Sequence, residues 1–139
     1  MNITLSSEHR AIVTATFREI IPISDTFVHM FYNRLFELKP TVKPLFNSSI
    51  DDQGPKLIAM LVILVKSLDR LDDLVPAIQA LSKRHVKYGV VQEDYPVVGE
   101  ALLWALEYML KERFTSDVKM AWAAMYTALA DICIEAGYR

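Results

Sequence analysis

The 139-residue chain is poor in cysteine and glycine, with 1 and 4 residues of these types. The single cysteine, Cys133, excludes an intrachain disulfide, a thiolate zinc cage and the paired-cysteine motifs of redox or cofactor-attachment sites. The sparse glycines argue against a phosphate-binding loop, and therefore against nucleotide chemistry of the P-loop or dinucleotide type. Because this cysteine usage is typical of a reducing compartment, we predict a cytoplasmic protein.

The chain also lacks an excess of charge of one sign and long apolar runs. Its 15 basic and 17 acidic side chains give a net charge of -2, which predicts no attraction to nucleic acid or anionic lipid. The longest apolar run, residues 57–65, is too short for membrane insertion, and the first residues lack the basic-then-apolar order of an export signal. With 53% hydrophobic residues, we expect one soluble globular domain spanning residues 1–139.

Prolines and glycines divide the chain into segments with helical rather than alternating periodicity, which predicts an all-α fold without strands. Between the second and third of six expected helices, we expect a helical turn after Pro40 and a polar loop over Asn47–Asp52. The six expected helices run from Ser6 or Ser7 to Ile21, from about Asp25 to Leu38, from an Asp52 cap through Leu68, from an Asp72 or Asp73 cap to Gly89, from about Asp94 to Glu112, and from a Thr115 cap toward Ala136.

Three of these helices carry polar side chains on or beside apolar faces. Tyr32 lies on the inward face of the second helix, and Gln53 lies one turn before Leu57 at the mouth of the apolar stripe of the third. The fourth helix places His85 in its last turn, on a face shared with three apolar residues, Ala77, Ile78 and Leu81.

His85 has two interpretations, because an imidazole on an apolar face is either a satisfied core histidine or an axial metal ligand. A neutral ring there can donate one N–H to the carbonyl of Leu81 or Ser82, which would aim the other nitrogen at a metal. The other histidines carry less information. His29 belongs to a polar stripe and His9 lies beside charged residues, so we predict both at the surface.

Three other residues also have ordinary alternatives. Tyr32 can be a core aromatic, Gln53 can simply help to start its helix, and Phe46 can be ordinary packing. Together with His85, however, they describe a pocket with a metal ligand on one wall and two hydrogen-bond donors on the other. Since one histidine cannot hold iron alone, the other ligands of such a metal would come from a macrocycle.

Five stretches carry a resemblance to a known family. They are FYNRLF at residues 31–36, KPTVKPLF at residues 39–46, Gln53 with Leu57, the stretch from Arg84-His85 through Gly89 to YPVVG at residues 95–99, and residues 122–126. In this order and at these separations, they resemble the bacterial single-domain globins related to the haem domain of flavohaemoglobins. The resemblance covers essentially the whole chain.

The resemblance implies a globin fold around a non-covalently bound haem b, with His85 as the proximal iron ligand. It implies that Phe46 packs on the haem face and that Tyr32, Gln53 and Leu57 form the distal pocket. The other implied contacts are Tyr95 on the proximal side, Arg84 at a haem propionate, and Val90, Val98 and Tyr126 along the cavity wall.

One position departs from the family pattern. In these globins a glutamate on the last helix usually hydrogen-bonds both the proximal histidine and the tyrosine at the position of Tyr95. Gly137 stands at that place here, and Glu135 lies two residues off the expected face. Because a carboxylate on the imidazole would favour O–O cleavage, its absence predicts a more neutral histidine that suits reversible binding.

The resemblance therefore predicts a haem globin that binds O2 reversibly at ferrous iron with high affinity, for oxygen binding, storage or delivery. NO and CO are the other expected ligands, a redox cycle would need an external reductase, and the protein is expected as a monomer or loose homodimer. The alternative is NO dioxygenase activity or other NO or nitrite detoxification with that reductase. A remote alternative is a helical interaction module without a cofactor.

Overall fold

The protein is described by a computed structural model over residues 5–46 and 49–138. Within these ranges the chain forms six α-helices joined by short 3₁₀ turns, and it contains no strand. The prediction of an all-α fold is therefore confirmed. The helices are α1 (Ser7–Ile20), α2 (Ser24–Leu38), α3 (Ile50–Lys66), α4 (Val75–Lys87), α5 (Asp94–Leu110) and α6 (Ser116–Tyr138).

Most helix ends lie where local residue chemistry predicts them. The Ser6 hydroxyl accepts the backbone N–H of His9 at 3.0 Å at the start of α1. The Thr115 hydroxyl accepts the N–H of Val118 at 3.3 Å at the start of α6. Gly89 follows α4 with φ of 100°, a left-handed conformation that glycine adopts without strain.

The start of α3 differs from the prediction. This helix begins at Ile50 rather than after Asp52, because the Ser49 hydroxyl accepts the Asp52 N–H at 3.3 Å and acts as the N-cap. Asp51 and Asp52 then lie in the first turn, where their negative charge complements the helix dipole. The part of the predicted loop at residues 47–48 lies outside the described residues.

The start of α4 also differs. Asp72 and Asp73 do not cap this helix but lie in the 3₁₀ segment η3 (Leu68–Leu74) that precedes it. The helix begins at Val75 without a side-chain cap, and Pro76 stands in its first turn. Proline is favoured there because the first helical N–H groups have no partner within the helix.

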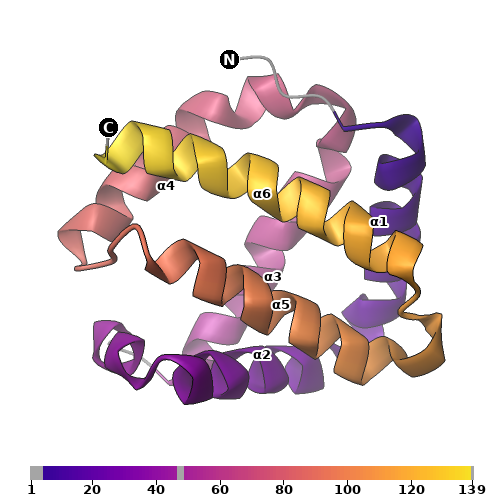
Figure 1. Cartoon of the computed structure of the whole chain (residues 1–139), viewed down its shortest axis with the longest axis horizontal. Helices are drawn as coiled ribbons and strands as arrows, with labels where there is room; N and C mark the ends of the chain where they lie inside the picture. Colours follow the sequence, from indigo (N-terminus) through magenta and orange to yellow (C-terminus); the bar gives the residue numbers. More distant parts are fainter. Residues whose placement is uncertain (1–4, 47–48, 139) are drawn as a thin grey trace.

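The helices pack in a way that separates α3 and α4. Helix α4 packs against α6 and η3, whereas α2 packs against α5 and α3, and α1 packs against α6 and α3. Figure 1 shows α5 and α6 crossing one face of the molecule, with α3 behind them and α2 along the lower edge. Within the described ranges, none of the helices has the length and apolarity that membrane crossing requires.

The core ties the framework helices together around a tryptophan. Trp122 is fully buried, and its indole N–H donates to the Thr16 hydroxyl at 2.8 Å, which joins α6 to α1. Phe27 and Leu35 of α2 and Leu106 of α5 are buried in the same cluster. This framework carries α3 and α4, the two helices that bear Gln53 and His85.

Candidate functional site

His85 lies in the last turn of α4 and is half-buried. Its Nδ1–H donates to the carbonyl oxygen of Leu81 at 2.8 Å, because a carbonyl can only accept. Of the two acceptors predicted from the sequence, Leu81 and Ser82, the structure selects Leu81. This bond leaves Nε2 as the lone-pair nitrogen, and Nε2 has no hydrogen bond within the described residues.

Helix α4 has a buried row of side chains and a half-open row beside it. Ile78 and Ser82 are buried, whereas Leu81 and His85 are half-buried and Ala77 is exposed. Ala77 thus lies outside the core, at the start of the row that continues through Leu81 to His85. Successive helical residues are about 100° apart, so the row that ends in His85 lies beside the buried row rather than on it. His85 consequently lies at the edge of the helix contact, where a flat group can reach it.

The loop after α4 is fixed by bonds from three other elements. The carboxylate of Asp94, itself buried, accepts the Val91 N–H at 2.9 Å and forms an ion pair with Lys39 at the end of α2. The Tyr138 hydroxyl of α6 donates to the Val90 carbonyl at 2.5 Å. The segment that follows His85 is thus held in place by α2, α5 and α6.

Tyr95 extends from α5 toward the same region. It is half-buried, and its hydroxyl oxygen is shielded from solvent without a hydrogen bond in the described part of the chain. Burial raises the pKa of this hydroxyl well above its usual value, so it stays protonated. The Tyr126 hydroxyl donates to the Tyr95 carbonyl at 2.7 Å and joins α6 to α5.

Tyr32 points inward from α2, as predicted, and its side chain is 6% exposed. It packs edge-on against Phe31 and Phe46, with ring centroids 4.9 Å and 5.5 Å away. Burial is the only cause that raises the pKa of Tyr32 to about 12, so neither a charge nor a hydrogen bond contributes. The hydroxyl is therefore a protonated donor in aromatic surroundings.

A cavity of about 170 Å³ brings the predicted distal residues together. Tyr32, Phe46 and Gln53 all line it, although they come from α2, the turn after it and α3. The remaining lining residues are Asn33, Phe36, Lys43, Ser49 and Ile50. Two polar side chains thus meet at an aromatic-walled hollow beside the first turns of α3.

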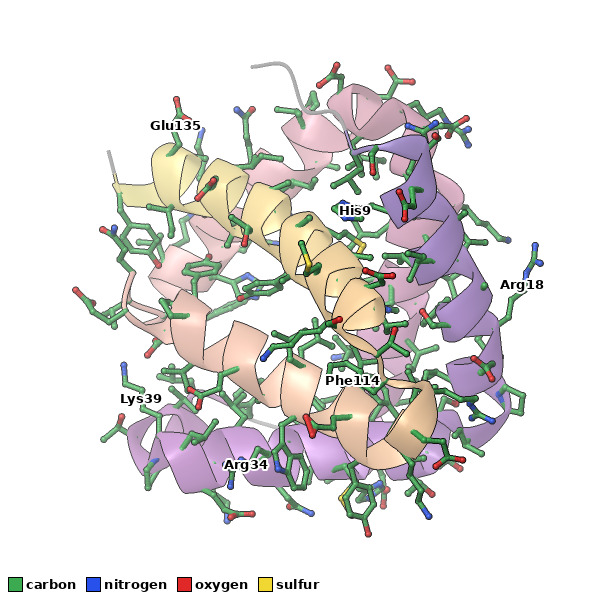
Figure 2. All side chains as sticks on the ribbon, turned by 45° about the vertical axis from the view of Figure 1, so that its right-hand side comes forward. His9, Arg18, Arg34, Lys39, Phe114 and Glu135 are labelled. Atoms are coloured by element: carbon green, nitrogen blue, oxygen red, sulfur yellow. The ribbon has the colours of Figure 1, made fainter. Side chains whose placement is uncertain are left out.

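A larger hollow of about 730 Å³ lies elsewhere, between α1 and the end of α3. Its lining includes Arg10, Phe17, Arg18 and Lys66 but none of the predicted site residues. Figure 2 shows the Arg18 side chain extending away from α1 into solvent. We place the functional site at the smaller cavity because predicted site residues line it, whereas none of them lines the larger hollow.

The remaining predicted site residues do not line the small cavity. Leu57 is half-buried one turn after Gln53 and packs on the core. Val90 and Val98 are half-buried near the start of α5, and Arg84 is exposed beside His85.

The two other histidines differ from His85. The His29 side chain is 45% exposed, its Nδ1–H donates to the Asp25 carbonyl at 2.8 Å, and its Nε2 lies 3.2 Å from an Asp51 oxygen, as expected for a surface residue. His9 is half-buried, and Figure 2 shows its ring between α1 and α6, so the prediction of a surface position is only partly right for it.

These residues fit the haem that the sequence resemblance implies. A haem site needs a lone-pair nitrogen, apolar walls for the ring and hydrogen-bond donors on the opposite side. His85 supplies the nitrogen through Nε2, Phe46 supplies an aromatic wall, and the Tyr32 hydroxyl supplies a donor at the small cavity.

Two features of the site were not predicted from the sequence. The Ser82 side chain is 0% exposed, and its hydroxyl donates to the Cys133 carbonyl of α6. Gly137 packs so closely on Ser82 that an added Cβ would lie 2.8 Å from the serine oxygen. The only sequence signal was a serine one turn before His85 on a helix, which by itself has no distinctive meaning.

Comparisons with known proteins agree with this geometry. The family model described as Globin matches residues 29–133. The flavohemoprotein of Pseudomonas aeruginosa is 35% identical over 136 residues, which cover 95% of this chain and 35% of that protein. The flavohemoprotein of Burkholderia sp. strain TH2 is 34% identical over 134 residues, covering 94% and 34%. The chain thus spans about a third of the length of these curated relatives.

A solved structure shares the whole arrangement of helices. It is an engineered carbene transferase from Rhodothermus marinus, named as a nitric oxide dioxygenase, and it is 30% identical to this chain. The two superpose with a TM-score of 0.81, covering 92% of this chain and 89% of that one. Because the superposition covers nearly the full length of both chains, the two proteins have the same overall fold.

Proposed function

Because this chain belongs to the globin family, we propose that it binds O2 reversibly and with high affinity at the ferrous iron of a non-covalently held haem b. The haem supplies a metal with an open position for a diatomic ligand. His85 holds the metal through Nε2, and Tyr32 and Gln53 donate hydrogen bonds to the ligand.

The observation that carries this proposal is the state of the Tyr32 hydroxyl. It is buried among aromatic rings, remains protonated far above neutral pH, and lines the same cavity as Gln53. A protonated hydroxyl that lines a small, aromatic-walled cavity can donate a hydrogen bond to a polar ligand there, and such a bond is strongest when the ligand carries charge. This favours a ligand that gains negative charge when it binds, as O2 does, over a ligand that stays neutral.

The other residues have supporting roles in this proposal. We assign Phe46 and Leu57 to the distal side of the haem, Tyr95 to the proximal side, Arg84 to a propionate, and Val90, Val98 and Tyr126 to the cavity wall.

Stopped-flow measurement of O2 release tests the proposal. A charge-assisted hydrogen bond contributes roughly 1.5 to 3 kcal/mol, so we expect Tyr32→Phe to speed O2 release by about ten- to a hundredfold. Gln53→Leu should also speed release, by a smaller factor. Tyr108→Phe is the matched control, since Tyr108 is 50% exposed on α5, and it should leave the rate unchanged. An unchanged rate in Tyr32→Phe would contradict the distal assignment.

A second candidate function is NO dioxygenase activity with an external reductase. It is favoured by the similarity to the flavohemoproteins and to the engineered protein named as a nitric oxide dioxygenase. Many NO turnovers per haem in the presence of a reductase would support this activity. A single stoichiometric reaction with NO would support reversible O2 binding instead.

We further propose that the protein acts in the cytoplasm as a monomer or loose homodimer. The lone cysteine is buried and lies in a helix, which suits a reducing compartment. Sedimentation at increasing protein concentration would test the oligomeric state, and a stable dimer at the lowest concentrations would contradict it.

A further inference from the structure

The face of α4 behind His85 is joined to α6 by one buried hydrogen bond. The Ser82 hydroxyl donates to the Cys133 carbonyl at 2.5 Å, and Ser82 is 0% exposed. Cys133 lies in the last two turns of α6, so the bond joins α4 to the C-terminal end of that helix. The Ser82 hydrogen bond therefore fixes where along α6 the α4 turn before His85 packs.

Gly137 lies one turn beyond Cys133 and makes this contact close. A Cβ at this position would lie 2.8 Å from the Ser82 oxygen and 3.0 Å from a Val86 methyl carbon. Ser82 and Val86 are one turn apart on α4, on either side of His85 in the sequence. A larger residue at 137 would have to displace the Ser82 hydroxyl, whose bond to Cys133 joins the turn before His85 to α6.

The hydrogen-bond acceptor of the His85 imidazole is a neutral group. Its N–H is bound to the Leu81 carbonyl, and no carboxylate forms an ion pair with His85 over residues 5–46 and 49–138. Glu135 is the nearest acidic residue along α6 to Gly137, and it is exposed. Figure 2 shows its side chain directed outward from α6, away from α4.

Tyr95 adds a third helix to this contact. Its buried hydroxyl has no hydrogen bond among the described residues, and the Ser82 side chain is near enough to influence its pKa, which burial chiefly raises. On the side that faces α5, the group next to the α4–α6 contact is thus the neutral, protonated Tyr95 hydroxyl.

We propose that Ser82 and Gly137 are positioning residues that seat α4 on α6 so that the His85 N–H meets only the Leu81 carbonyl. The inference rests on the proposed role of His85 as the haem ligand. A carbonyl polarises the imidazole less than a carboxylate does, so the metal receives less electron density. These two residues therefore favour reversible ligand binding over O–O cleavage.

The distances suggest a pair of substitutions that reverses this arrangement. Gly137→Glu alone would collide with the Ser82 oxygen, whereas Ser82→Ala removes the atom that makes the 2.8 Å contact and leaves Val86 at 3.0 Å. The double variant S82A/G137E therefore offers space for a carboxylate facing α4. The readouts are haem content, the iron–histidine stretching band in resonance Raman spectra of the ferrous protein, and the Fe(III)/Fe(II) potential.

Single variants provide the comparison that does not depend on the double variant folding. Gly137→Ala should shift and broaden the iron–histidine band by displacing α4, and Ser82→Ala should broaden it by releasing the bond to Cys133. Glu135→Gln, on the outer side of α6, is the matched control and should leave the band unchanged. In S82A/G137E the band should move to higher frequency and the potential should fall relative to Ser82→Ala.

Two outcomes would overturn the inference. One is a wild-type band position and width in both Gly137→Ala and Ser82→Ala. The other is a shifted band in Glu135→Gln, which would mean that a carboxylate of α6 already acts on His85. Failure of the proposed function is distinguishable, because it would appear as missing haem or a missing iron–histidine band in the unsubstituted protein.

Discussion

The proposed site has one wall on α4, which carries His85, and one wall on α2 and α3, which carry Tyr32 and Gln53. The two walls hold their functional groups in different ways. On the α4 wall the imidazole N–H is already bound to the Leu81 carbonyl, so the ring is oriented before any ligand arrives. On the α2–α3 wall Tyr32 lines the small cavity, and its hydroxyl has no hydrogen bond in the described residues. In the proposed site the imidazole is therefore oriented in advance, whereas the Tyr32 hydroxyl keeps its O–H available for a ligand.

Both walls depend on a glycine at a close helix crossing. A Cβ on Gly54 of α3 would lie 2.7 Å from a Val28 methyl carbon of α2, and a Cβ on Gly137 would lie 2.8 Å from the Ser82 oxygen. Gly54 is next to Gln53 and thus acts on a hydrogen-bond donor, while Gly137 acts on the turn that carries His85. In the proposed site, the same kind of close packing would therefore affect ligand release on one side and metal coordination on the other.

Removing the imidazole is expected to have the largest effect on this comparison. His85→Ala should abolish most haem binding, because the α4 wall has no other nitrogen ligand in the row that ends at His85. The absorbance ratio of haem to protein after purification measures this loss. His29→Ala, which changes a 45% exposed histidine, should retain haem. Equal haem content in the two variants would show that His85 is not the residue that holds the haem.

Gly54→Ala should disturb the distal wall alone. Overpacking against Val28 costs about 1 to 3 kcal/mol, which outweighs the gain of about 0.5 to 1 kcal/mol from replacing glycine within a helix. We expect a lower free energy of unfolding in urea and an altered O2 release rate. The iron–histidine band should stay at its wild-type position, and a shift would mean that the two walls are not independent.

Thr16→Val should destabilise the framework without changing either wall. It removes the acceptor of the Trp122 indole N–H, a 2.8 Å bond in the fully buried core. An unsatisfied buried donor costs about 1 to 3 kcal/mol. Thermal unfolding should report the loss, while O2 release and the iron–histidine band stay near wild type. A changed release rate would show that the core and the site are coupled.

The pH dependence of O2 release should be the smallest effect. Burial raises the pKa of Tyr32 from about 10 to about 12, so the hydroxyl remains a donor across the neutral and mildly alkaline range. The release rate should therefore be flat from pH 6 to about pH 9. Since the folded-state pKa lies above the unfolded one, the contribution of Tyr32 to stability is complete below pH 10 and is lost as pH rises toward 12. An O2 release rate that increases between pH 7 and pH 9 would mean that a group other than the Tyr32 hydroxyl titrates in this range.

The fold was predictable because its signals are local. Proline, glycine and serine or threonine caps mark most helix ends, as Ser6, Gly89 and Thr115 show. The exceptions involve competition between similar signals. Ser49 and Asp52 are both good caps, and the earlier residue capped the helix while the later one joined its first turn.

The site was predictable only in part, because half of it depends on contacts between distant residues. The inward direction of Tyr32 and the internal bond of His85 follow from helical spacing within a few residues. The Ser82 bond to Cys133 joins positions 51 residues apart, and the role of Gly137 depends on what lies opposite. A single sequence carries no sign of such pairings, since neither residue is unusual in its own helix.

The absorption spectrum of the protein purified with haem tests the central claim most directly. The account predicts an intense near-ultraviolet haem band in the ferrous protein that shifts when CO is added, with about one haem per chain. A colourless protein after haem has been supplied would contradict it, as would a haem band that does not respond to CO.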